Sequence, residues 1–210
     1  MINIKSKIIA KQFRKPSGLL GRIISKIMEE HNIYLYDFIL EEINKINNFE
    51  KILEIGYGPG IGINKLLSQN NKVTFNGIDF SKLMYKRATR LNKYYISKNK
   101  LNLIYGDLKE YDFDEQKYKV IFGINIVYFW NSLNEYFKKI YKLLKKNGLL
   151  ILFFMKPEDL IKIKLTQTDV FYKYDKDEII NILKKNGFKR FNIIENIRNG
   201  RLGYFVFAYK

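Results

Sequence analysis

The stretch Glu54-Ile55-Gly56-Tyr57-Gly58-Pro59-Gly60 decides how this chain of 210 residues folds. It follows a short apolar run, Lys51-Ile52-Leu53, and precedes an amphipathic segment from Ile61 to Ser68. We therefore predict a strand that ends in a carboxylate, and a glycine-rich turn that leads directly into a helix. Because glycine lacks a Cβ, the backbone of such a turn can approach a ligand closely and adopt conformations that other residues resist.

The turn differs from the dinucleotide-binding fingerprint GxGxxG, because its sixth position is Ile61 rather than glycine. It reads instead as E-x-G-x-G-x-G, with Glu54 before the first glycine. This pattern resembles motif I of the class I S-adenosylmethionine (SAM)-dependent methyltransferases. The alternative is a generic tight turn between a strand and a helix, and Glu54 with the downstream pattern favours the methyltransferase interpretation.

The composition is that of a folded globular protein. A hydrophobic share of 47% and an aromatic share of 16% argue against disorder. No apolar run approaches the roughly 20 residues that a membrane span requires. The N-terminus interrupts its isoleucines with lysines and so lacks a signal-peptide core. We therefore expect a cytoplasmic location.

The net charge of +17 has two explanations. A basic surface attracts nucleic acid by releasing counterions from phosphate. Alternatively, the abundance of Lys, Asn, Ile and Tyr reflects AT-rich codons, and the lysines are scattered rather than gathered in one block. The scatter favours the second explanation, so nucleic acid is a possible but less favoured partner.

The chain has no cysteine and a single histidine, His31. The absence of cysteine excludes a Cys nucleophile for pyrimidine C5 methylation, a radical SAM cluster and thiolate zinc sites. One histidine makes a multi-histidine metal site or a Ser-His-Asp triad implausible. We expect no metal.

Strand-like runs alternate with helical patterns, as in a parallel α/β sheet. We place strands at Lys51–Ile55, Lys72–Ile78, Asn102–Tyr105, Lys119–Ile124, Leu149–Phe154, Phe188–Ile197 and Leu202–Tyr209. The pair Asn199-Gly200 is a hairpin signal, so the last strand should be antiparallel to its neighbour. Class I methyltransferases end in the same way. The resemblance implies an α/β, Rossmann-like, seven-stranded, mostly parallel sheet with an antiparallel last strand and helices on both faces.

Two later helices have start and stop signals. Ser132 and Glu135 form a capping box, and Gly148 supplies the C-terminal stop. Asp175 begins the second helix, which Gly187 ends.

Residues 1–48 are predicted to form an N-terminal helical cover, or lid, over a SAM-binding domain at residues 49–210, the two making one structural unit. An apolar stripe falls on one face of a basic helix and comprises Leu19, Leu20, Ile23, Ile24, Ile27 and Met28. Such a helix more often packs on its own domain, but peripheral contact with a membrane is the alternative. In similar methyltransferases, N-terminal helices cover the cofactor and help to form the substrate cleft.

The resemblance also assigns residues to SAM. The turn with Gly56, Tyr57, Gly58 and Gly60 would approach the methionine portion, and Glu54 would supply negative charge beside its amine. Asp79, after the second strand, would accept the ribose hydroxyls. The alternative for Asp79 is to cap the helix that starts near Ser81.

The adenine end of SAM would lie farther along the sheet. Gly106, Asp107 and Leu108 resemble the adenine site, with a plain turn as the alternative. Phe80 and Met84 could sandwich the ring or belong to the core.

The segment from Gly123 to Trp130 corresponds to motif IV, beside the transferred methyl. It lacks the Asn/Asp-Pro-Pro-aromatic sequence of enzymes that methylate exocyclic amines of bases, and is similar to the type 11 methyltransferases, which act on small molecules. Asn125 could orient a nucleophile, and Tyr128 and Trp130 could line the methyl-facing pocket or pack in the core. His31 is a candidate general base, with a structural role as the more frequent alternative.

The sequence therefore favours a SAM-dependent methyltransferase that acts on a small-molecule acceptor. The alternatives are an RNA methyltransferase, a lipid headgroup N-methyltransferase that uses the basic N-terminal helix, and a non-catalytic interaction protein on the same fold. The three acids Glu54, Asp79 and Asp107 argue against the non-catalytic protein.

Overall fold

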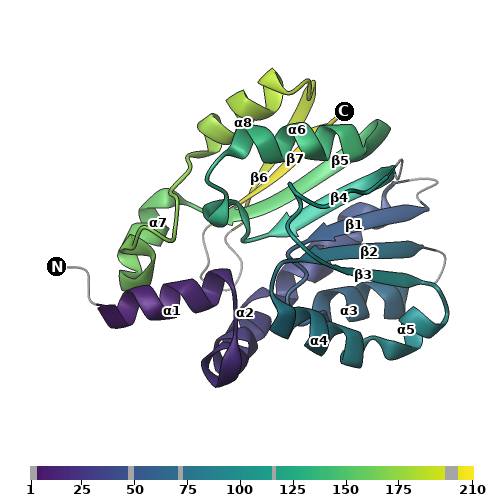
Figure 1. The fold of residues 1–210 in the computed structure, drawn as a ribbon. Helices are drawn as coiled ribbons and strands as arrows, with labels where there is room; N and C mark the ends of the chain where they lie inside the picture. Colours follow the sequence, from purple (N-terminus) through teal and green to yellow (C-terminus); the bar gives the residue numbers. More distant parts are fainter. Residues whose placement is uncertain (1–3, 47–49, 71–72, 115–116, 197–202) are drawn as a thin grey trace.

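The protein is built on one seven-stranded sheet (Figure 1). The computed structural model describes residues 4–46, 50–70, 73–114, 117–196 and 203–210. The strands are β1 (Lys51–Ile55), β2 (Thr74–Asp79), β3 (Leu101–Tyr105), β4 (Tyr118–Ile124), β5 (Leu144–Met155), β6 (Arg190–Asn196) and β7 (Gly203–Tyr209). Their order in the sheet is β3-β2-β1-β4-β5-β7-β6.

The sheet is parallel except at its last strand. β7 pairs in antiparallel fashion with both β5 and β6, whereas the pairs among β1 to β5 are parallel. This arrangement confirms the predicted mostly parallel sheet with an antiparallel last strand. The predicted Asn199-Gly200 turn lies outside the described residues.

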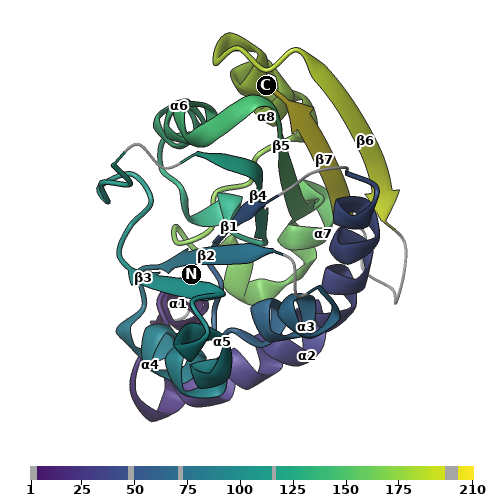
Figure 2. The ribbon, with the colours of Figure 1, turned by 90° about the vertical axis from the view of Figure 1, so that its right-hand side faces the viewer.

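Helices cover both faces of the sheet. One face bears α6 (Leu133–Leu143) and α8 (Lys176–Lys185), and the other bears α2 (Gly18–Asn44), α3 (Ile61–Gln69), α4 (Lys82–Leu91) and α5 (Lys93–Ser97) (Figures 1 and 2). Beside the sheet lie α1 (Ile4–Arg14), η1 (Val127–Phe129), α7 (Pro157–Lys162) and η2 (Lys164–Gln167) (Figure 1).

The two apolar layers follow from the alternation of side chains along each strand. On β1, Leu53 packs with α6 and α8, and the preceding Ile52 packs with α2 and α3. β4 repeats this pattern with Ile121 and Phe122. These residues are fully buried, so the sheet has a core on each side.

Of the two predicted helix starts, one is confirmed. The carboxylate of Asp175 accepts a hydrogen bond of 2.7 Å from the backbone N–H of Asp177. Ser132 does precede α6, but its side chain makes no capping hydrogen bond, so the predicted capping box is wrong. Glu135 instead pairs with Nζ of Lys109 at 2.9 Å.

The stop predicted at Gly148 is also wrong, because α6 ends at Leu143 and β5 begins at Leu144. Leu144 pairs with Tyr118, and the next pair is Val120 with Leu149. Gly148 therefore belongs to an irregularity in β5, where extra residues bulge out of the ladder. Gly187, with a φ of +98°, does follow the end of α8.

The helix α2 packs in two different ways. Its C-terminal half buries Leu35, Ile39 and Ile43 in the core layer with α3. In its N-terminal half, Leu19 and Ile23 are 77% and 61% exposed. The expectation that the stripe from Leu19 to Met28 packs on the domain is therefore wrong for most of its members, with Ile24 buried as the exception.

The first half of α2 turns a different face to the protein. Ser25 accepts a hydrogen bond from Arg87 on α4, and Glu29 forms an ion pair of 2.8 Å with the same guanidinium. Gly21 packs closely on the backbone of Pro16, where the Cβ of any other residue would lie only 2.8 Å from that backbone. These contacts orient the apolar stripe away from the sheet.

Candidate active site

A pocket lies at the carboxyl ends of β1, β2 and β4, where an open parallel sheet binds ligands. The glycine turn forms one wall of it with Gly56, Tyr57 and Gly58. The φ angles of Gly56 and Gly58 are +73° and +55°, a region that L side chains rarely adopt. A Cβ on Gly58 would meet nothing within 4 Å, so the turn leaves room beside its backbone.

Gly60 does not line this pocket, contrary to its predicted role. It has a φ of +83°, and a Cβ there would meet Ala88 at 2.8 Å and Asn92 at 2.7 Å. Its lack of a side chain therefore permits α3 to begin close against α4.

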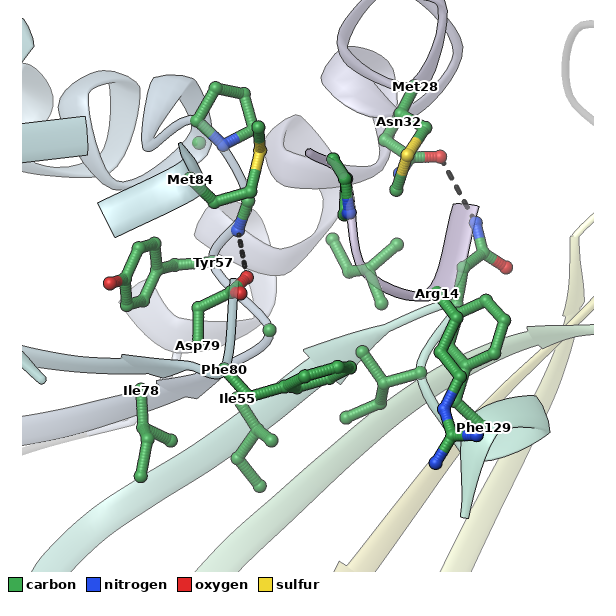
Figure 3. A pocket seen from close by; sticks show the side chains of 18 of the residues that line it. Arg14, Met28, Asn32, Ile55, Tyr57, Ile78, Asp79, Phe80, Met84 and Phe129 are labelled. Atoms are coloured by element: carbon green, nitrogen blue, oxygen red, sulfur yellow. Dashed lines mark hydrogen bonds between the residues drawn. The ribbon is translucent and has the colours of Figure 1, made fainter. Parts of the chain in front are cut away.

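Asp79 lies in the pocket with both carboxylate oxygens engaged. Oδ2 accepts a hydrogen bond of 2.9 Å from the N–H of Gly58, and Oδ1 accepts one of 2.8 Å from the N–H of Ser81. Each oxygen has a further lone pair for a ligand hydroxyl. Burial raises the pKa of Asp79 to about 6. Figure 3 shows this carboxylate beside Tyr57 and Met84.

The alternative role of Asp79 as a helix cap is wrong. Ser81 is the N-cap of α4, and its Oγ accepts a hydrogen bond of 3.3 Å from the N–H of Met84. The same Oγ donates to the backbone oxygen of Pro16 at 2.7 Å. The connection between α1 and α2 is thereby fixed next to Asp79.

Glu54 lies behind the glycine turn and does not line the pocket. Its Oε1 accepts a hydrogen bond of 2.7 Å from the hydroxyl of Tyr36, whereas its buried Oε2 has no hydrogen-bond partner among the described residues. Burial raises the pKa of Glu54 to about 8. A nearby cation would offset this cost and favour the ionised carboxylate.

The far end of the pocket is formed by the residues predicted for adenine. Gly106, Asp107, Leu108, Phe80 and Met84 all line it. The hydroxyl of Tyr136 donates to the carboxylate of Asp107 at 3.1 Å, and Trp130 stacks on Tyr136 with ring centroids 4.4 Å apart. Trp130 thus lies at the end of the pocket that the sequence predicted for adenine.

Asn125 is the most constrained residue of motif IV. It has a φ of +56°, a conformation that asparagine tolerates better than most residues. Its Oδ1 accepts a hydrogen bond of 3.0 Å from Tyr128, and its Nδ2 donates one of 3.1 Å to Oδ1 of Asn32. Tyr128 in turn accepts from the N–H of Met155. This chain of hydrogen bonds fixes the orientation of the Asn125 amide.

Residues from the N-terminal helices complete the pocket, and the sequence did not identify them. Phe13, Met28, Asn32 and Tyr36 all line it. Figure 3 shows Met28, Asn32 and Phe129 across the pocket from Asp79. Asn32 and Tyr36 are polar residues within a long helix and belong to no recognisable motif. The sequence therefore gives little indication that they face a pocket. Tyr136 was not predicted as a site residue either, although its hydroxyl needs a partner when buried.

A second cavity of about 240 Å³ adjoins the first. The two share Phe13, Met28, Asn32, Asn125 and Phe129 as lining residues. The other residues of the second cavity are Ile27, His31, Tyr128, Met155, Leu160, Ile163, Leu165, Thr166 and Phe171. It therefore lies between α2 and the segment after Phe154, and it includes the candidates His31 and Tyr128.

Comparisons with known proteins point to one class. A family model described as "Methyltransferase domain" matches residues 52–148. An uncharacterized methyltransferase of Bacillus subtilis, YdaC, is 29% identical over 126 residues, which cover 60% of this chain and 67% of that protein. A ubiquinone biosynthesis O-methyltransferase of Pelagibacter ubique is 29% identical over 181 residues, which cover 76% of this chain and 73% of that protein.

Solved structures share the fold. An O-methyltransferase family protein from Burkholderia thailandensis has a TM-score of 0.69 and 11% identity, covering 89% of this chain and 59% of that one. A phosphoethanolamine N-methyltransferase of Haemonchus contortus in complex with SAM has a TM-score of 0.67 and 16% identity, covering 84% and 52%. The chain thus spans between half and three fifths of the length of these two proteins.

The pocket fits the cofactor that these matches imply. It offers an open glycine turn and, at Asp79, a carboxylate with free lone pairs, and the buried, unpartnered carboxylate oxygen of Glu54 lies behind the turn. The glycine turn suits a ligand segment that binds close to the backbone, Asp79 suits a ribose diol and Glu54 suits a nearby ammonium group. SAM has all three. The fold, the site and the matches support a SAM-dependent methyltransferase with SAM as its cofactor, as the sequence predicted, and they are consistent with the class I group that the sequence resembles.

Proposed function

We propose that this methyltransferase transfers a methyl group to a small, largely apolar molecule that binds in the second cavity. The observation that supports this proposal is the common wall of the two cavities, formed by Asn125, Phe129 and residues of the N-terminal helices. An acceptor in the second cavity would meet the cofactor pocket at this wall. Most lining side chains there are aliphatic or aromatic, so an apolar acceptor would be favoured by burial.

The charges around the second cavity disfavour the other acceptors. Among the described residues that line it there is no lysine or arginine, which an RNA phosphate would need, and no aspartate or glutamate, which would stabilise the amine of a lipid headgroup. The names of two similar proteins agree with an apolar acceptor. One is the ubiquinone biosynthesis enzyme, and the other is a sterol 24-C-methyltransferase that is 26% identical over 111 residues.

The residues of the site would contribute mainly alignment and the exclusion of water. SAM, when bound, supplies a methyl group on a sulfonium that is already activated for in-line displacement. Asp79 would hold the ribose, and Asn125 would fix the boundary between cofactor and acceptor through its bonds to Asn32 and Tyr128. Correct alignment of reacting groups contributes up to about 7–11 kcal/mol to such a step.

The proton of a hydroxyl acceptor would leave through His31. This side chain lines the second cavity and is also exposed to solvent. A ring nitrogen of His31 can accept the proton and pass it to water. Tyr128 cannot serve as this base near neutral pH, because burial raises the pKa of its hydroxyl well above the usual range. We assign Tyr128 a positioning role through Asn125.

The proposal is tested by supplying SAM with a tritiated methyl group to the protein and a cell extract. Label should enter small molecules that partition into organic solvent rather than RNA or protein. Leu165→Trp should block this labelling by filling the second cavity while SAM binding persists. Ile161→Trp is the matched control, because Ile161 is 51% exposed and does not line the cavity. Label recovered chiefly in RNA would contradict the proposal.

A further inference from the structure

Exposed aliphatic side chains gather at one end of the molecule. They are Ile4 and Ile8 of α1, Leu19, Leu20, Ile23 and Ile27 of α2, and Ile161 and Ile163 at α7 and η2. Among the described residues, the other large aliphatic side chains with comparable exposure are Leu91 and Ile193. We term this group the apolar end face. Clustered exposure of this kind marks an interaction site more often than scattered single residues do.

The four elements at the apolar end face, α1, α2, α7 and η2, are held together. α1 packs on both α2 and η2, and Nζ of Lys7 forms an ion pair of 2.7 Å with Asp169, just after η2. Figure 1 shows α1 next to the start of α2 and next to α7. The face is therefore a continuous part of the fold and not a set of separate side chains.

The apolar end face is also strongly basic. Residues 4–28 contain five lysines, two arginines and no aspartate or glutamate. Lys5, Lys11, Arg22 and Lys26 are exposed among the apolar residues of α1 and α2. This combination of apolar and cationic side chains complements a bilayer with anionic headgroups, because each group of side chains strengthens the attachment of the other.

The acceptor cavity opens onto this face. Ile27 and Ile163 are 39% and 37% exposed, and both also line the second cavity. The exposed His31 lines it as well, one turn of α2 beyond Ile27. An apolar path thus leads from the surface into the cavity.

We propose that the apolar end face docks on an anionic lipid bilayer and places the mouth of the second cavity against the membrane. An apolar acceptor would then enter from the lipid phase, a consequence that rests on the proposed function. A second copy of this chain fits the face less well, since pairing two such surfaces would bring like charges together.

The test uses the full chain and vesicles of phosphatidylcholine, with or without phosphatidylglycerol, in a co-sedimentation assay. A protein with a net charge of +17 binds many anionic surfaces, so the decisive variants leave the charge unchanged. Leu19→Ser with Ile23→Ser should lower the partition coefficient on anionic vesicles about tenfold or more, because two side chains no longer enter the interface. Leu91→Ser with Tyr94→Ser, exposed residues on α4 and α5, is the matched control and should bind like the parent protein.

The outcomes separate the possible occupants. Equal binding of both double variants and the parent would overturn the proposal, since the attraction would then be general and electrostatic. Failure of the parent to bind anionic vesicles would overturn it too. A dimer in light scattering that Leu19→Ser with Ile23→Ser dissociates would assign the face to self-association instead. The vesicle assay contains neither SAM nor acceptor, so its result is independent of the methyl-transfer assay.

Discussion

Asn32 on α2 and Asn125 at the end of β4 are joined by a hydrogen bond of 3.1 Å between Oδ1 and Nδ2. Both residues line the cofactor pocket and the second cavity. The N-terminal helices therefore contact motif IV directly, at the place where the two cavities meet. The bond links the position of α2 to the geometry of the candidate site.

Asn32→Ala should loosen this link. It removes the acceptor of the Asn125 amide, a loss of about 0.5–1.5 kcal/mol for a neutral hydrogen bond. Amide hydrogen exchange in the first half of α2 should become faster, and SAM should bind more weakly. Asn32→Asp retains an acceptor oxygen and is the matched control. Unchanged exchange and affinity in the alanine variant would show that the bond has no role in closing the site.

Asp79→Ala should weaken SAM binding by about 1.5–3 kcal/mol, the range for hydrogen bonds to charged groups. The structure adds an effect on stability, because the N–H groups of Gly58 and Ser81 would lose their acceptor. Asp79→Asn keeps one acceptor oxygen and should be milder. Calorimetry measures the affinity, and thermal unfolding by circular dichroism measures the stability. An alanine variant with the affinity of the parent would mean that the ribose is held elsewhere.

Glu54 should make the unliganded protein less stable as the pH rises. Its pKa is raised by burial from 4.5 to about 8, so the folded protein retains a proton that the unfolded chain has lost. The stabilising contribution is full below about pH 4.5 and is lost as the pH rises to about 8. The free energy of unfolding, from urea titrations at several pH values, should fall over this interval.

Glu54→Gln is the control for this pH dependence, since glutamine keeps an acceptor for Tyr36 and does not titrate. Its unfolding free energy should vary less between pH 5 and pH 8, the interval set by the shifted pKa of Glu54. The parent should also release a proton when SAM binds, seen as a calorimetric heat that depends on the buffer. Identical pH profiles for the two proteins would refute the assignment of a raised pKa to Glu54.

Gly62→Ala should destabilise the protein although alanine favours helices. A Cβ at Gly62 would lie 1.9 Å from the ring of Tyr36, which must then move and weaken its bond to Glu54. Overpacking of this kind costs about 1–3 kcal/mol. Gly106→Ala is the control, because the nearest atom to its Cβ is 3.6 Å away. Chemical denaturation compares the two, and equal stability would contradict the contact with Tyr36.

His31→Ala should slow methyl transfer by about 100-fold, the lower range for general base catalysis, while SAM affinity stays within a factor of a few. The acceptor is the molecule recovered from the labelling experiment. The pH–rate profile of the parent should show a group that must be deprotonated, and the variant should lack this limb. A variant with the full rate and the same profile would assign the proton to another carrier.

The sheet could be predicted from the sequence because the residues of each buried strand are themselves mostly apolar. Runs such as Lys51–Ile55 are rich in β-branched residues and end at turn residues, so six of the observed strands begin within two residues of the prediction. β5 is the exception, since the pairing of Leu144 with Tyr118 depends on a neighbouring strand.

The site was predicted in its sheet half and missed in its helical half. Asp79 ends β2 and Gly58 follows β1, and the ends of parallel strands meet at one edge of the sheet. Asn32 and Tyr36 reach the pocket because α2 packs against the sheet and α3, a tertiary arrangement that no local pattern encodes. The apolar stripe that begins at Leu19 likewise indicates that this face of α2 binds something, but the sequence does not say what covers it.

Calorimetric titration of the full chain with SAM and with S-adenosylhomocysteine tests the central claim most directly. The account predicts that each compound binds with a stoichiometry of one and that NAD and FAD give no binding heat under the same conditions. Asp79→Ala in the same cell should weaken both interactions. A folded sample that binds neither SAM compound would contradict the account.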